Sequence, residues 1–176
     1  MTAPIDSDQV QSELHRFPEV TRFPLVVYHA VVATDGEDAA ELYEELFARH
    51  GWGGGWRNGI YGYHHFHANQ HEVLGIAGGR ASVRFGGEKG PLVEVRAGDV
   101  VVVPAGVSHC RERASEDLLV VGAYPGGKSP DIHRGTPDDN PQARRKIGQA
   151  GLPAADPVFG RQGPLIRYWS DRHAGA

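Results

Sequence analysis

Frequent turns divide much of this chain into segments that are too short for helices. Between residues 59 and 124 the breaks contain glycine or proline, which favour turns. They are Gly78-Gly79, Gly86-Gly87, Gly90-Pro91, Gly98 and Pro104-Ala105-Gly106. The apolar segments that they separate lie at about 60–67, 71–77, 80–86, 91–96, 99–103, 108–113 and 118–124. Short strands at this close spacing predict an all-β sandwich or barrel. The glycine content, 24 of 176 residues against an average of roughly 7%, supports the same prediction.

Before this region the pattern changes twice. Residues 1–23 are polar and predict no regular structure, whereas 25–32 is rich in β-branched residues and predicts a strand. The chain then predicts one helix, at 36–50, which opens on a capping-box pair, Thr34 and Glu37. Its apolar positions recur at helical spacing, as expected for a helix that packs on a sheet. The glycine-rich stretch 51–55 lacks the context of a phosphate-binding loop and is interpreted as an ordinary loop.

The end of the chain is the least regular part. Of the 12 prolines, 7 lie in 125–176, and no long periodic segment appears there. This stretch is too short to form its own core. We therefore expect one domain over 1–176, with the barrel at about 24–124 and an irregular tail at 125–176 that packs over it. The expected apolar anchors of the tail are Val158, Phe159, Leu165, Ile166, Tyr168 and Trp169.

Charge and composition exclude several classes of protein. The net charge of −4 includes no basic excess, which argues against nucleic acid or a membrane surface as a partner. The single cysteine, Cys110, cannot form a disulfide within the chain. The first residues lack the features of a signal peptide, and no run approaches the roughly 18 apolar residues of a membrane span. A cytoplasmic protein is the resulting prediction.

Histidines are concentrated in one short stretch. Four of the ten lie between His64 and His71. Side chains two apart on a strand face the same way, so His65 and His67 share one side. A turn at 68–70 could return Glu72 to that side, and a neighbouring strand could aim His109 inward. Three imidazoles and a carboxylate that converge in this way would form a mononuclear site for a divalent metal. The alternative is a set of surface or core histidines without a ligand role.

The spacing of these residues favours the metal site. From Gly59 the chain reads G-x5-H-x-H-x4-E-x6-G, with His65, His67, Glu72 and Gly79 at the fixed places, and from Gly98 it reads G-x5-P-x-G-x2-H, ending at His109. These two motifs resemble those of the cupin superfamily. The resemblance implies a double-stranded β-helix, or jelly-roll barrel, in which His65, His67, Glu72 and His109 are the metal ligands. One position departs from the motif, because Arg113 stands where asparagine is usual.

The flanking sequences narrow the resemblance. Residues 56–61, 120–125 and 156–160 are similar to a group of small single-domain bacterial cupins of unsettled activity. The resemblance therefore implies one divalent transition metal (iron, manganese, nickel, copper, cobalt or zinc) and a small-molecule ligand. Among similar cupins this ligand set often supports dioxygenase or oxidase chemistry, so the favoured hypothesis is a metal-dependent oxidoreductase. The alternatives are a non-catalytic metal or ligand binder, and a non-oxidative isomerase, decarboxylase or lyase.

Other residues near the motifs are candidates for substrate binding. By strand alternation Arg111 and Arg113 share the side of His109, where a cation would favour a carboxylate or enolic substrate. The alternative is that they are rim arginines paired with Glu112, Glu116 or Asp117. Tyr63 is a third candidate. Cys110, next to His109, is expected to face the opposite way as a small buried hydrophobe.

Two further expectations concern the surfaces of the sheets. His64 and His71 lie one residue from His65 and Glu72, so they are expected to point to the other face of their strands, beneath the helix or the tail. The apolar strand at 25–32 is expected to lie near a sheet edge and to provide the interface of a homodimer.

Overall fold

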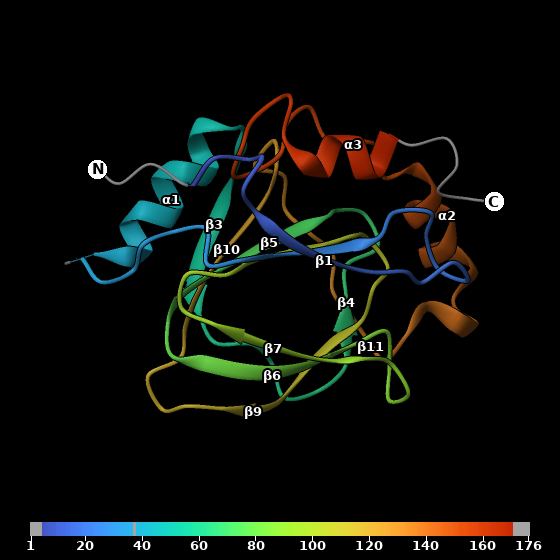
Figure 1. Cartoon of the computed structure of the whole chain (residues 1–176). Coiled ribbons are helices and arrows are strands. Elements are labelled where there is room, and N and C mark those ends of the chain that lie inside the picture. The colour runs from blue at the N-terminus through green and yellow to red at the C-terminus, as the bar shows by residue number, and fades with distance from the viewer. Residues whose placement is uncertain (1–4, 37, 171–176) are drawn as a thin grey trace.

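The computed structural model describes residues 5–36 and 38–170. Two antiparallel sheets face each other in it as the walls of a flattened barrel (Figure 1). The first sheet contains β1 (Gln11–His15), β2 (Leu25–His29), β3 (Trp52–Asn58), β5 (Glu72–Gly78), β8 (Val100–Val103) and β10 (Leu119–Pro125). The second contains β4 (His65–Phe66), β6 (Arg80–Phe85), β7 (Leu92–Arg96), β9 (His109–Ala114) and β11 (His133–Arg134). The strand orders are β1-β2-β8-β5-β10-β3 and β11-β4-β9-β6-β7. The predicted double-stranded β-helix is confirmed.

Helices α1 (Ala39–Arg49) and α3 (Pro164–Ser170) cover the outer face of the six-stranded sheet. Helix α2 (Pro141–Gln149), which follows a short 3-10 turn, η1 (Pro137–Asp139), packs instead beside β4, where Ala143 and Ile147 contact Phe66 and Ala68. Figure 1 shows α1 and α3 lying over this sheet, while β6, β7 and β9 form the uncovered wall. The central strands of the six-stranded sheet are thus buried on both faces, which explains the unbroken run of buried valines in β8. In β7, by contrast, buried and exposed residues alternate.

Strand β2 shows how the two faces form two cores. Leu25 and Val27 point between the sheets and join the barrel core, whereas Val26 and Tyr28 point outward into the core beneath the helices. Helix α1 can lie close to the sheet because the strand below it has a glycine. A Cβ atom on Gly75 would lie 2.5 Å from the ring of Tyr43, which is fully buried in α1. The absence of a side chain at this position therefore sets the distance between helix and sheet.

The start of α1 differs from the prediction. Asp38, rather than Thr34, is the N-cap residue, and its carboxylate accepts a hydrogen bond from the backbone N–H of Glu41 at 2.8 Å. Glu37, the other member of the predicted capping box, lies outside the described residues. The helix itself is confirmed, with a shorter extent than 36–50.

Three segments are more regular than the sequence predicted. Strand β1 forms within the polar N-terminal stretch by pairing with β2. The glycine-rich stretch after α1 belongs to β3, because β10 pairs with it and satisfies its backbone groups. The tail contains β11, α2 and α3 instead of being irregular. Five of the six predicted anchors are placed as expected: Val158, Leu165 and Trp169 are buried in the core beneath the helices, with Phe159 and Tyr168 packed against them. Ile166 is half-buried and does not belong to this core.

The surface proposed for a dimer is not available. Strand β2 lies between β1 and β8 rather than at an edge, and Leu25 to Tyr28 are completely buried. The expectation of an interface on this strand is therefore wrong, because β1 forms in a polar stretch that predicts no strand and pairs with the edge of β2. Homodimerisation itself stays a prediction.

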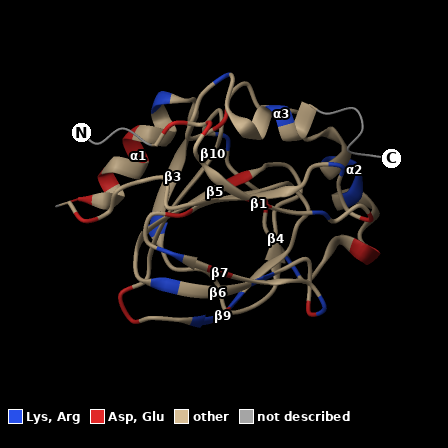
Figure 2. Ribbon diagram, in the orientation of Figure 1, with Lys and Arg blue, Asp and Glu red and all other residues tan. Residues whose placement is uncertain are grey.

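Basic and acidic residues are interspersed along the part of the chain that the structure describes, and the basic ones form no continuous stretch there (Figure 2). Acidic residues line the outward side of α1, where Glu44 binds the guanidinium of Arg57 on β3 through two contacts of 2.7 and 2.8 Å. Among the described residues, no helix has both the length and the apolar character needed to span a membrane.

Candidate metal centre

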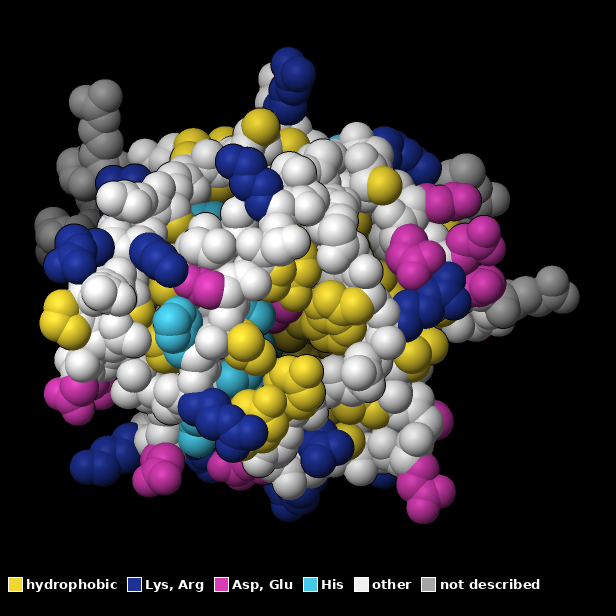
Figure 3. Space-filling model, turned by 180° about the vertical axis from the view of Figure 1, so that it is seen from behind, with side chains coloured by type: hydrophobic (Ala, Val, Ile, Leu, Met, Phe, Trp, Pro, Cys, Tyr) yellow, Lys and Arg dark blue, Asp and Glu magenta, His cyan; other side chains and the backbone are white. Residues whose placement is uncertain are grey.

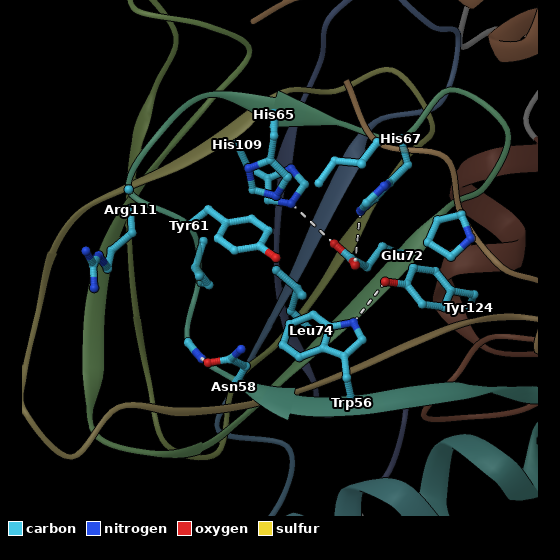
Figure 4. Close-up of a pocket in the computed structure, with 15 residues that line it drawn as sticks. Trp56, Asn58, Tyr61, His65, His67, Glu72, Leu74, His109, Arg111 and Tyr124 are labelled. Carbon is cyan, nitrogen blue, oxygen red and sulfur yellow. Dashed lines mark hydrogen bonds and ion pairs between the residues drawn. The ribbon is translucent and has the colours of Figure 1, made fainter. Parts of the chain in front are cut away.

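Three histidines and one glutamate converge inside the barrel at one end. The imidazoles of His65, His67 and His109 are buried, and one nitrogen from each lies within 4.8 Å of those of the other two. The carboxylate of Glu72 contacts two of them, with Oε2 3.3 Å from Nε2 of His67 and Oε1 3.2 Å from Nε2 of His109. Figure 4 shows the four side chains pointing toward one another. The predicted four-residue cluster is thus assembled.

Strand pairing explains the convergence. His65 on β4 lies directly opposite His109 on β9, and their ring centroids are 4.0 Å apart. Glu72 begins β5 on the facing sheet. The turn before β9 is tied to the segment after β4 by a hydrogen bond from Gly106 N to the carbonyl oxygen of His67 at 2.8 Å. Gly106 has a φ of 92°, a conformation that other residues rarely adopt. This glycine therefore lets the second motif close onto the first.

All three imidazoles are oriented by the backbone in the same way. The Nδ1 atoms of His65, His67 and His109 lie 3.1, 2.5 and 3.2 Å from the carbonyl oxygens of Tyr63, Asp131 and Val107, respectively. A carbonyl oxygen only accepts, so in each contact Nδ1 must carry the hydrogen. When such a ring is neutral, its lone pair lies on Nε2. Each histidine is therefore oriented so that Nε2 is the nitrogen available to a metal.

Burial and mutual contact shape the electrostatics of the cluster. Burial, with the neighbouring His109, lowers the pKa of His65 to about 3, so this imidazole is neutral at physiological pH. Burial also acts to lower the pKa of His67, but contact with Glu72 outweighs it and the pKa is raised. Burial opposes ionisation of Glu72, yet its hydrogen bonds to His109 and His67 hold its pKa well below the ordinary value. The site therefore keeps a buried carboxylate anion among imidazoles.

A cavity of about 570 Å³ opens onto the cluster. Besides the four clustered residues, its lining includes Trp56, Tyr61, Leu74, Tyr124, Pro130 and Ile132. Figure 3 shows the hollow ringed by hydrophobic side chains, with histidines along one side and an acidic group at its depth. The volume suits a small organic molecule, and walls that combine apolar side chains with converging polar groups are typical of ligand sites.

Two residues that line the cavity beside this cluster were not predicted to have a functional role. Tyr124 points its hydroxyl toward Glu72 (Figure 4), and burial together with the nearby Glu72 raises its pKa, so the phenol keeps its proton. Trp56 donates a hydrogen bond from Nε1 to the Tyr124 hydroxyl at 2.8 Å. The indole reaches that position by lying over Gly122, the residue opposite Trp56 on β10. Alternation along β10 places 120, 122 and 124 on the inner face, which is the one sequence signal that could have identified Tyr124.

The contact between Trp56 and Gly122 yields a stability prediction. A Cβ atom at Gly122 would lie 2.1 Å from Cε2 of Trp56. Gly122→Ala should therefore displace the indole, break its bond to Tyr124 and lower the free energy of unfolding by about 1–3 kcal/mol. Urea denaturation followed by circular dichroism measures the change. Gly148→Ala in α2 is the control, because nothing lies within 4 Å of its added Cβ. Equal urea midpoints for Gly122→Ala and wild type would contradict the prediction.

The three candidate substrate residues are placed differently. Arg111 lines the cavity, at its edge beyond Tyr61 (Figure 4). Arg113 does not, because a bulge shifts the β6–β9 register between the pairs Val83–Arg111 and Ser82–Arg113. This irregularity breaks the predicted alternation, so Arg113 joins Ser82 and Glu94 in a separate surface hollow. Tyr63 is also outside the cavity lining.

The contacts of Tyr63 explain its position. Its ring stacks on the ring of Tyr61, with the two centroids 5.0 Å apart. The guanidinium of Arg134 lies over the Tyr63 ring, 4.1 Å from the ring centroid. Tyr61 is therefore the tyrosine of this segment that lines the cavity. Of the predicted rim ion pairs, the structure shows Glu112 bound to Arg84 instead of to Arg111 or Arg113.

His71 faces away from the cluster as expected, whereas of His64 the structure shows only that it does not line the cavity. His71 accepts a hydrogen bond from Ala105 N at Nδ1 and donates from Nε2 to the carbonyl oxygen of Gly151. Its ring lies edge-on to Trp169 of α3, so it packs beneath the tail as predicted. Burial lowers the pKa of His71 to about 4 and keeps this ring neutral. Cys110 is buried, as expected.

The donor set fits a divalent transition metal. Neutral imidazole nitrogens and one carboxylate are ligands that iron, manganese, cobalt, nickel, copper and zinc accept. Glu72 offsets part of the charge, and the fixed Nδ1 hydrogens leave three Nε2 lone pairs available. The three buried histidines could therefore bind a metal ion.

Comparison with known proteins agrees with this geometry. Residues 57–124 match the family described as Cupin. A Bacillus subtilis (strain 168) protein described as "Uncharacterized protein YjlB" is 43% identical over 154 residues, which are 88% of this chain and 90% of that protein.

Solved structures resemble the chain more distantly. Acireductone dioxygenase from Bacillus anthracis, with a cadmium ion in its active centre, is 18% identical, with a TM-score of 0.37 over 71% of this chain and 84% of that one. Procruciferin, an 11S globulin from Brassica napus, is 16% identical with a TM-score of 0.38. The match covers 64% of this chain but only 22% of procruciferin. What these two proteins bind is a property of each of them. From its motifs, its match to the family and its relative of almost equal length, we conclude that this chain belongs to the cupin family.

Proposed function

We propose that the chain binds one divalent transition metal through His65, His67, Glu72 and His109 and acts on a small organic molecule held in the adjoining cavity. The observation that carries the proposal is the shared orientation of the three imidazoles. Each gives its Nδ1 hydrogen to a backbone carbonyl and turns Nε2 toward Glu72 and the cavity. Histidines with only a packing role would not need the same tautomer and the same direction.

A metal held by these four residues would supply Lewis acidity, or one-electron chemistry with O2 if it is redox-active. The protein's own residues define what reaches it. Trp56, Leu74 and Ile132 give the cavity apolar walls, which exclude water from the ligand. The protonated Tyr124 hydroxyl, held by Trp56, offers a hydrogen-bond donor beside Glu72. Such a site suits a ligand with an apolar body and an oxygen-bearing end.

We favour a dioxygenase or oxidase, as the resemblance to other cupins with three histidines and one glutamate suggests. The test measures oxygen consumption by protein loaded with iron, manganese, nickel or copper against a panel of carboxylic and enolic compounds. Metal-dependent oxygen uptake with one of them is the expected result. Turnover without oxygen uptake would support an isomerase, decarboxylase or lyase. Tight ligand binding without turnover for any metal would identify a binding protein.

Arg111 supports a carboxylate or enolic substrate. Its guanidinium makes no hydrogen bond or ion pair with another residue in the described part of the chain, and it lines the cavity edge. A Cβ atom on Gly62 would lie 3.1 Å from Nη2 of Arg111, so the glycine leaves room for the guanidinium. A ligand that extends from the histidines past Tyr61 would place an anionic end at this arginine.

Arg113 provides a matched control for this proposal. Calorimetric titration of zinc-loaded protein with benzoate and with the uncharged isostere benzamide separates the contribution of charge. We expect Arg111→Gln to weaken benzoate binding about 10-fold or more, the value of a charged hydrogen bond, and to leave benzamide binding unchanged. Arg113→Gln should leave both unchanged, because that side chain lies outside the cavity. Equal losses in the two variants, or none in Arg111→Gln, would contradict a direct role.

A further inference from the structure

One of the three imidazoles depends on a distant part of the chain. The acceptors for His65 and His109 are the carbonyl oxygens of Tyr63 and Val107, each two residues earlier in the same segment. The acceptor for His67 is the carbonyl oxygen of Asp131, 64 residues later. The orientation of His67 is therefore set by the segment that follows the last barrel strand, whereas the other two orientations are local.

Asp131 is itself fixed against the chain beside His67. Its Oδ1 accepts hydrogen bonds from the backbone N–H groups of Ala68 at 2.7 Å and Asn69 at 3.3 Å. In return, Asn69 Oδ1 accepts from Asp131 N at 2.9 Å, and Asn69 Nδ2 donates to the carbonyl oxygen of Ser129 at 3.3 Å. We call these reciprocal bonds the Asn69–Asp131 clamp. They hold the Asp131 carbonyl in place directly over the residues that follow His67.

The same segment also completes the sheet and the cavity. Its strand β11 pairs with β4, with His133 opposite Phe66 and Arg134 opposite His65. Pro130 and Ile132, on either side of Asp131, line the cavity. Residues 129–134 therefore supply part of the cavity wall, an edge strand beside His65 and the acceptor that orients His67. Among the described residues, the carbonyl oxygen of Asp131 is the one acceptor within hydrogen-bond distance of His67 Nδ1.

We infer that Asp131 is a positioning residue for the metal centre. It acts through His67, because its docked backbone carbonyl holds the ring with Nδ1 on the backbone and Nε2 toward Glu72 and the metal site. Without the clamp, the carbonyl would no longer fix Nδ1, and the ring could turn so that Nε2 leaves the site. The tail is then part of the centre as well as a cover for the barrel. This inference rests on the proposed metal site.

The principal test compares three variants by cobalt binding. Asp131→Ala removes both acceptor bonds of the clamp, and we expect about a 10-fold to 100-fold loss of cobalt affinity, as is typical for groups that orient a metal ligand. Asp131→Asn keeps an Oδ1 acceptor, so it should stay within about 3-fold of wild type. Asp139→Ala, an exposed aspartate in the same tail, should bind like wild type. Competition with a chromogenic chelator gives the affinities, and the visible cobalt spectrum reports the ligand geometry.

A second variant and a metal-free measurement keep the test decisive. Asn69→Ala breaks the clamp from the other side and leaves Asp131 in place, so it should reproduce the loss if Asp131→Ala fails to fold. In metal-free protein, nitrogen-15 spectra of the histidine rings should show a slowly exchanging hydrogen on His67 Nδ1 in wild type, whatever the state of Nε2, and its loss in Asn69→Ala and Asp131→Ala. A slowly exchanging Nδ1 hydrogen and wild-type affinity in the clamp variants would overturn the inference. Absence of cobalt binding in wild type would overturn the metal site, while the ring spectra would still decide the role of Asp131.

Discussion

Replacement of His65, His67 or His109 by alanine is expected to remove stoichiometric metal binding. Each histidine supplies one Nε2 lone pair whose direction is fixed by a backbone carbonyl on the other side of the ring. Loss of a group that only orients a ligand costs about 10-fold to 100-fold in affinity, so loss of a ligand itself should exceed about 100-fold. Elemental analysis of protein purified without added metal measures the content, and chelator competition measures the affinity.

The controls must separate a lost ligand from a lost fold. His15→Ala is matched in chemistry, because His15 lies on β1 and contacts Glu13 far from the cluster. It should retain the wild-type metal content. Circular dichroism should show that the three ligand variants keep their sheets, since apolar side chains such as Leu74, Val83 and Phe85 form the barrel core. If all three variants keep wild-type metal content and affinity, the proposed site is wrong.

The part of the site that the sequence predicts is the part that depends on local geometry. Alternation on a strand places His65 and His67 on one side, and the turn after Ala68 returns Glu72 to the same space. His109 follows from its own motif because the glycine turn before β9 is local. These relations survive folding because a strand has only two faces and a short turn has few conformations.

The remaining parts depend on contacts that no periodicity records. Asp131 orients His67 only because the tail returns across β4, and the sequence around it has no repeating pattern that predicts this path. The bulge that turns Arg113 outward is a register shift between two strands, so it is invisible in either strand alone. Glycines disfavour strands, but pairing with β10 places Gly53 in β3 nevertheless. Tertiary pairing overrides local propensity in each case.

Glu72 should be as necessary for metal binding as the histidines. It is buried, contacts His67 and His109, and is the anionic member of the cluster. Without it three neutral imidazoles would hold a divalent charge with no anionic partner, in a site where burial makes that charge costly. Groups that only orient a ligand contribute about 10-fold to 100-fold to metal affinity. Loss of a ligand should cost more, so Glu72→Ala should lower the metal affinity by at least about 100-fold. Glu72→Gln keeps the shape and removes the charge, so it isolates the electrostatic part of that loss.

His64 and His71, the two histidines beside these ligands in the sequence, are not expected to bind the metal. His64 and His71 should be dispensable for metal binding, because neither lines the cavity. His71→Ala should nevertheless lower the free energy of unfolding by about 2–4 kcal/mol, since it removes two buried hydrogen bonds and the ring contact with Trp169. Metal titration alongside urea denaturation separates the two effects. If His64→Ala or His71→Ala loses metal while folded and Glu72→Ala keeps it, the ligands lie on the other face of these strands and the assignment of the centre fails.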